Sequence, residues 1–132
     1  MKSIALNLAL SAILVFAPIK ATLIAVMVLT MVDLVSGLLA ARKRGEAITS
    51  TGLKRTLIKI AVYEIVVLLG FITEQYLTGD LLPVVKILAG LVGITELKSV
   101  LENLEEITGM PLLKMFIQKL ANLGSSPNEP LP

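Results

Sequence analysis

The stretch that decides the fold is ATLIAVMVLTMVDLVSGLLAARKR, residues 21–44. From Ala21 to Ala41 it carries a single charged side chain, that of Asp33, and three basic residues follow directly. A helix needs about 20 predominantly apolar residues to cross the hydrocarbon core of a bilayer. A run of this length that ends in Arg42-Lys43-Arg44 is typical of a membrane-spanning helix that stops at a positively charged surface.

Three further apolar runs lie on either side, at residues 4–19, 57–77 and 81–101. The runs at 21–41, 57–77 and 81–101 each have the length of a span, so three transmembrane helices are expected. The run at 4–19 is shorter and contains Pro18, so it is a short span, a half-buried hairpin arm or an interfacial segment. The expected fold class is an all-α integral membrane protein with three or four transmembrane helices.

The first apolar run also has the length and the Lys2 flank of a signal peptide. Pro18 directly after Phe16-Ala17 disfavours cleavage there, and the next apolar run starts almost at once, as in a tight helical hairpin. We therefore expect this segment to be retained.

Basic residues cluster between the second and third apolar runs and at the start of the third. This basic loop comprises Arg42, Lys43, Arg44, Lys54, Arg55 and Lys59, with Glu46 as the one acidic residue among them. The excess of positive charge predicts that the loop is cytoplasmic. The short, slightly acidic connection Thr78-Gly79-Asp80 is then outside, and the C-terminus returns to the cytoplasm. An N-terminus inside goes with four spans, and one outside goes with three.

After the last run, Glu102, Glu105 and Glu106 are expected to form an acidic turn. Gly109 and Pro111 should end one helix and open another. The new helix, at 111–123, is amphipathic and suits a membrane surface or a neighbouring subunit; the apolar residues that repeat at helical spacing are Leu112, Leu113, Phe116, Ile117 and Leu120. Residues 1–123 are thus expected to form a single membrane helical domain, and residues 124–132 a disordered tail.

Carboxylates inside the spans need an explanation, because an ionised group at the centre of a membrane helix costs about 2.5–3.5 kcal/mol on insertion scales. Asp33, Glu64 and Glu96 lie about 8–12 Å from the cytoplasmic ends of their runs, at 1.5 Å per residue. Lys59 and Lys98 are close enough to pair with them across the bundle or to extend to the surface. We expect an ion-pair network in a closed state, and a possible hydrated pore wall once subunits cluster.

Small and polar residues indicate where helices can pack. Candidates for helix packing and oligomerisation are Asp33, Ser36, Gly37, Ala40, Ala41, Gly90 and Gly93. The last span carries a polar stripe, which comprises Glu96, Ser99, Glu102 and Asn103. The stripe and Glu64 are the candidates for a pore wall. Such a stripe favours self-association, because other helices can satisfy it and hydrocarbon cannot.

Catalysis is not expected. The chain has no cysteine, which excludes disulfides, thiolate catalysis and thiolate metal sites, and no histidine, the commonest general base and metal ligand. The remaining carboxylates give no arrangement with assignable acid and base roles, so no enzyme activity, cofactor or metal site is predicted. A net charge of +2 is too small to indicate nucleic-acid binding.

Three motifs in order resemble the toxin-secretion and phage-lysis holin family, the class four type of phage holin. They are Asp33-Leu34-Val35-Ser36-Gly37-Leu38-Leu39-Ala40-Ala41, then Ser50-Thr51-Gly52-Leu53-Lys54-Arg55 leading to Lys59, then Glu96-Leu97-Lys98-Ser99-Val100-Leu101-Glu102-Asn103 before Gly109 and Pro111. The resemblance spans about residues 24–120. Ser36 stands where the family more often has threonine, and Thr95 where asparagine is usual.

The resemblance implies a homo-oligomer that accumulates in the bacterial cytoplasmic membrane and then opens lesions. An endolysin or a secreted toxin is released through them, without necessarily touching the holin. Two alternatives are a non-lytic ring or anchor subunit of a virion or secretion machine, and a narrow ion channel in which Asp33, Glu64 and Glu96 bind cations.

Overall fold

The computed structural model describes residues 2–79 and 81–124, and every regular element in this part of the chain is helical. The helices are α1 (Lys2–Phe16), α2 (Lys20–Lys43), α3 (Ser50–Ile72), α4 (Val84–Thr108) and α5 (Leu112–Gly124). A 3-10 turn, η1 (Ala17–Ile19), joins α1 to α2, and a π-helical turn, η2 (Thr73–Leu77), extends α3. The prediction of an all-α fold is confirmed.

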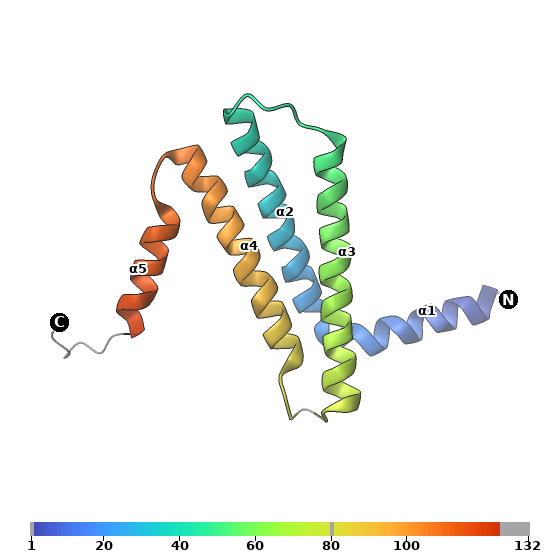
Figure 1. Cartoon of the computed structure of the whole chain (residues 1–132). Helices are drawn as coiled ribbons and strands as arrows, with labels where there is room; N and C mark the ends of the chain where they lie inside the picture. Colours follow the sequence, from blue (N-terminus) through green and yellow to red (C-terminus); the bar gives the residue numbers. More distant parts are fainter. Residues whose placement is uncertain (1, 80, 125–132) are drawn as a thin grey trace.

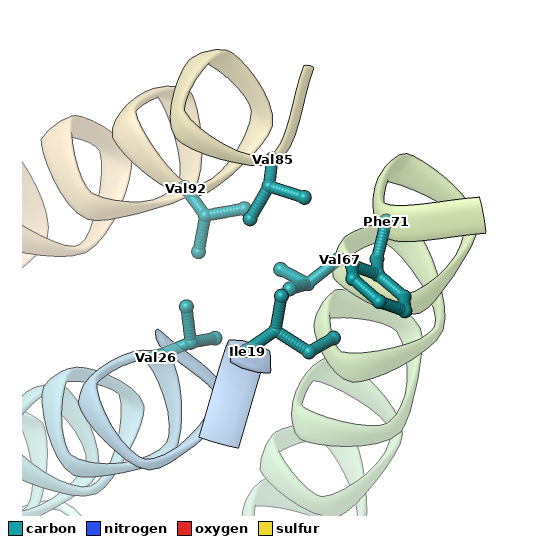
Figure 2. Close-up of a cluster of buried hydrophobic side chains, with 6 residues drawn as sticks. All are labelled: Ile19, Val26, Val67, Phe71, Val85 and Val92. Atoms are coloured by element: carbon teal, nitrogen blue, oxygen red, sulfur yellow. The ribbon is translucent and has the colours of Figure 1, made fainter. Parts of the chain in front are cut away.

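Helices α2, α3 and α4 pack side by side into a bundle, and each contacts the other two (Figure 1). The buried apolar cluster lies where α1 joins it: Ile19 and Val26 meet Val67 and Phe71 of α3 and Val85 and Val92 of α4 (Figure 2). The ring centroids of Phe16 and Phe71 are 5.8 Å apart, which fixes the end of α1 to the bundle. This core is small for a chain of this length.

Most large apolar side chains point away from the bundle. Leu57 on α3 is 64% exposed and Ile94 on α4 is 68% exposed. Such an extensive apolar surface is unsuited to water and suits lipid or other protein. By length and composition, two described helical stretches can cross a membrane, Ser3–Lys43 and Ser50–Leu77. Helix α4, which carries Lys86, Glu96 and Lys98, is not one of these two stretches. The span predicted at 81–101 and the number of spans therefore stay predictions.

Two boundaries differ from the sequence-based prediction. Helix α3 starts at Ser50, because the side chain of Thr49 accepts a hydrogen bond from the N–H of Gly52 and caps the helix. The basic residues Lys54 and Arg55 therefore lie on its first turns. Helix α4 extends beyond the predicted span, through the acidic residues Glu102, Glu105 and Glu106 to Thr108, since glutamate is a good helix former, and it breaks at Gly109, with φ +73°, as predicted.

The first two apolar runs do not form the tight hairpin that was expected. Helix α1 leaves the bundle sideways at the end opposite the α2–α3 connection and does not lie along α2 (Figure 1). Pro18 lies in the first residues of η1, a place where proline starts a helical turn without reversing the chain. Because Ala17–Ile19 stay helical, the connection contains no loop that would turn α1 back on α2.

The predicted C-terminal amphipathic helix is present as α5, from Leu112 to Gly124. After Gly109 and Pro111 the chain turns back, and α5 lies beside α4 (Figure 1). A cavity of about 340 Å³ remains between them, lined mainly by Leu97 and Leu101 of α4 and Phe116 and Ile117 of α5. The predicted disordered tail begins at Gly124, which ends α5; its remaining residues, 125–132, lie outside the described residues.

Candidate functional site

Polar side chains meet in the interior of the bundle, toward the end where α2 finishes and α3 begins. We call this set the polar network; it comprises Asp33 and Ser36 on α2, Lys59 and Tyr63 on α3, and Glu96 and Asn103 on α4. Every helix of the bundle contributes two members.

Lys59 is the centre of the polar network. Its Nζ lies 2.7 Å from Oδ2 of Asp33 and 2.8 Å from Oε2 of Glu96. The side chain of Glu96 is 0% exposed and that of Asp33 is 14% exposed. Charges removed from water to this extent are tolerated only when they are paired and hydrogen-bonded. One ammonium thus holds two carboxylates from two other helices, and the three groups together carry one formal negative charge when all are ionised.

Hydrogen bonds extend the network along α4. The hydroxyl of Tyr63 donates to Oε1 of Glu96 at 2.9 Å. The Nδ2 group of Asn103 donates to Oδ1 of Asp33 at 3.2 Å and to Oγ of Ser36 at 3.0 Å. The Ser36 hydroxyl in turn donates to the backbone carbonyl of Asp33 at 3.0 Å. In an apolar surrounding these bonds specify one register between the helices, because any slip leaves a polar group unpaired.

A hollow of about 370 Å³ adjoins the network. It is lined by Asp33, Leu34, Gly37, Leu38, Arg44, Gly52, Arg55, Thr56, Ser99 and Asn103. Since Arg44, Gly52 and Arg55 are exposed residues at the end of the bundle, the hollow connects that surface with the carboxylate of Asp33. The predicted stripe residue Ser99 is half-buried here.

The predicted packing residues divide between the inside of the bundle and its surface. Ser36 and Ala40 are buried, and a Cβ on Gly37 would lie 3.5 Å from Nδ2 of Asn103. A Cβ on Gly93 would lie 3.8 Å from Leu29. These small residues therefore let α2 and α4 approach within one subunit.

The other two predicted packing residues are less enclosed. Ala41 is half-buried. Gly90 is exposed, with nothing within 4 Å of a Cβ placed on it, so it is free to face another molecule.

Two predicted acidic residues do not join the polar network. Glu64 follows Lys59 by five residues, which places it about 140° away around α3, and its shielded Oε1 accepts no hydrogen bond from the described residues. Glu102 is exposed and pairs with Lys98 on its own helix at 2.8 Å. Membership of the network therefore depends on the face of each helix as well as on depth.

Sequence reasoning missed two residues that shape this interior. Tyr63 follows Lys59 by four residues and so lies on the same face of α3, a spacing that was readable in advance. Gly70 has the most crowded surroundings of the described glycines: a Cβ there would lie 2.8 Å from Cδ1 of Leu88 and 3.7 Å from Cα of Val85. A single glycine inside an apolar run was the available signal.

The predicted basic loop makes a second polar contact at the same end of the bundle. Nζ of Lys43 donates to the carbonyl oxygens of Glu106 and Ile107 at 2.8 and 3.0 Å, where a cation suits the C-terminus of α4. Arg44 pairs with Glu46 and with Glu106. The Arg44 guanidinium, as hydrogen-bond donor, lowers the pKa of the Glu46 carboxyl below its ordinary value.

The remaining basic residues of that loop are directed to the surroundings. Arg42, Lys54 and Arg55 are exposed and form no ion pair with any residue that the structure describes. Within residues 2–79 and 81–124, no group of three or more acidic, cysteine or histidine side chains could hold a metal ion.

Comparison with known proteins gives one family. The model of the Bacteriophage holin family, which is not a family of enzymes, matches residues 11–125. No curated protein and no solved structure matches the chain. The match covers the bundle, the basic loop, the polar network and α5. The chain therefore belongs to the bacteriophage holin family.

Proposed function

We propose that this chain oligomerises in the bacterial cytoplasmic membrane and opens lesions through which a muralytic enzyme or a toxin leaves the cell. The observation that carries the proposal is the polar network: two carboxylates and an ammonium enclosed in a bundle whose outer surface is apolar. Membership of the holin family supports it. The proposal requires no catalysis and no contact with the released enzyme.

The proposed topology follows from the charge distribution. The end of the bundle with Arg42, Lys54 and Arg55 faces the cytoplasm, where positive residues near membrane helices accumulate (Figure 1). Helix α4 ends and α5 begins on that same side, so the start of α5 lies at the cytoplasmic surface in this arrangement, and α5 then runs back beside α4. The apolar outer surfaces of α2, α3 and α4 then face lipid or neighbouring subunits.

In the proposed mechanism, the polar network holds the subunit closed while it is dispersed in lipid. Lys59 pairs with both Asp33 and Glu96, which lowers the free-energy cost of holding these charges away from water. When subunits cluster, rearrangement of the helices exposes these groups to water, which then stabilises their charges in place of Lys59. The hollow beside Asp33 and Asn103 is where water first reaches the network from the cytoplasmic side.

Inducible expression in a bacterium tests the proposal, with membrane potential recorded while a co-expressed cytoplasmic muralytic enzyme reports escape of protein. We expect abrupt depolarisation followed by lysis. Depolarisation without escape of the enzyme would contradict protein-sized lesions and indicate a narrow channel. Absence of depolarisation, together with fixed stoichiometry to a partner, would support a non-lytic ring or anchor. Cells that express the muralytic enzyme alone are the control.

A further inference from the structure

A narrow polar stripe runs along α1, the helix that leaves the bundle. Ser3, Asn7 and Ser11 follow one another at steps of four residues, which places all three on one face of the helix. All three residues are exposed, and apart from Lys2 the rest of the helix is apolar. None of the three residues belongs to the polar network.

The stripe has no partner in its own subunit. None of the three side chains makes a hydrogen bond with any residue that the structure describes. Figure 1 shows why: α1 points away from α2, α3 and α4 and meets the bundle only at its last turn and at η1. In contrast, Asn103 in the bundle interior has both a carboxylate and a hydroxyl as partners.

Neither water nor lipid suits this helix. A helix lying at the membrane surface needs a broad, strongly polar face, whereas one asparagine and two serines cover only a strip of α1. The large side chains beside the strip, Leu10 and Leu14 among them, are exposed and favour immersion in hydrocarbon. There the Asn7 amide would lose its hydrogen bonds, a cost that only another polar group can remove.

We propose that α1 of one copy packs against α1 of a second copy through the face formed by Ser3, Asn7 and Ser11. An asparagine amide both donates and accepts, so the side chain is complementary to itself across a two-fold axis. Asn7 is the middle residue of the stripe and lies at the crossing point whether the paired helices run parallel or antiparallel. The inference rests on the proposed self-association and assigns it a specific contact.

Cysteine cross-linking in membranes tests the contact, because the natural chain has no cysteine. Copies with Ser11→Cys should form disulfide-linked dimers under mild oxidation if α1 pairs in parallel, and mixtures of Ser3→Cys and Ser11→Cys copies should do so if it pairs antiparallel. Either result supports the proposal. The matched control is Ile13→Cys, two residues along and about 200° around the helix, alone or mixed with Ser3→Cys. Cross-linking of the control as efficient as that of the stripe, or none in either, would overturn the proposal.

A second variant tests whether the amide of Asn7 stabilises the pairing. Asn7→Leu, combined with the reporting cysteine, should lower the association constant of the dimer about three- to thirtyfold, the range measured for interhelical hydrogen bonds in membranes. Ala5→Leu, on the opposite face, should leave it unchanged. Unchanged dimerisation in Asn7→Leu contradicts the proposal. Depolarisation and lysis by the unaltered chain are scored separately, so loss of this contact and failure of the holin function give different results.

Discussion

At the scale of single residues, Lys59 supplies the positive charge that the two enclosed carboxylates of the bundle require. It is the only cation within 4 Å of the two network carboxylates among the described residues, and it bridges helices that lie far apart in the sequence. Such a group contributes little net stability relative to an apolar core, but its removal leaves two charges without compensation. Its role is therefore to specify one arrangement of the three helices.

Replacing Lys59 by methionine should destabilise the bundle strongly, because Glu96 and Asp33 would be left facing each other. We expect a loss of about 3–5 kcal/mol in the free energy of unfolding, measured by denaturant titration of the protein in detergent. Lys98→Met, which breaks only an exposed pair with Glu102, should cost at most about 1 kcal/mol. Adding Glu96→Gln to Lys59→Met should recover part of the loss. Equal effects of the two lysine variants would contradict the account.

At the scale of helices, close packing of α3 on α4 depends on one missing side chain. Gly70 is buried, and a Cβ placed on it would overlap Cδ1 of Leu88 and touch the backbone at Val85. Gly90 on the other helix faces open space. The two glycines are both in helix interiors, so the same substitution at each has the same intrinsic effect on the helix and differs only in packing.

Gly70→Val should separate the two helices and lower stability by about 1–3 kcal/mol through overpacking. Gly90→Val should not lower it. Thermal unfolding in detergent, where subunits are dispersed, measures both. A destabilised Gly90→Val with an unaffected Gly70→Val would show that this helix contact is wrongly placed.

The ion pair between Arg44 and Glu46 in the α2–α3 connection should depend on pH. Arg44 lowers the pKa of Glu46 from its ordinary value of 4.5, so the folded state binds the proton of this group more weakly than the unfolded state does. The stabilising effect is therefore complete above pH 4.5 and is lost as pH falls through the lowered pKa. Hydrogen exchange of the backbone around Glu46 should accelerate, beyond the intrinsic pH effect, only in that acidic range. Arg44→Gln should abolish this step; persistence of the step would assign it to another group.

At the scale of the whole molecule, the bundle has an apolar outer surface and encloses charged side chains beside its apolar core, unlike a typical soluble protein. Exposed leucine, isoleucine and valine cover α2, α3 and α4, while the enclosed side chains include Glu96 and Thr30. Helix α1 and helix α5 extend on opposite sides of this bundle (Figure 1). Such a surface gives the molecule several faces for neighbours, and the proposed lesions require that neighbours be found.

Orientation in the membrane is testable with single cysteines and a membrane-impermeant maleimide. Lys54→Cys should react only when the cytoplasmic face is accessible, and Thr78→Cys only from outside. Ser3→Cys then reports on which side α1 begins, and so separates three spans from four. Labelling of Lys54→Cys from outside in intact cells would contradict the proposed topology.

The sequence by itself determined the all-α class, the helical apolar runs, the break at Gly109 and the family, because each depends on local pattern: run length, helix-breaking residues and ordered motifs. It also placed Asp33, Lys59 and Glu96 at similar depth, which follows from counting residues along each run.

Only the tertiary structure decided which of these residues meet. Asp33 and Glu96 share Lys59, whereas Glu64 and Glu102 are turned elsewhere, because membership depends on the rotation of each helix against its neighbours. The direction of α1 was likewise beyond the sequence. Whether a proline turn folds a helix back or releases it sideways depends on packing with residues distant in the chain, here Phe16 against Phe71, which no local pattern encodes.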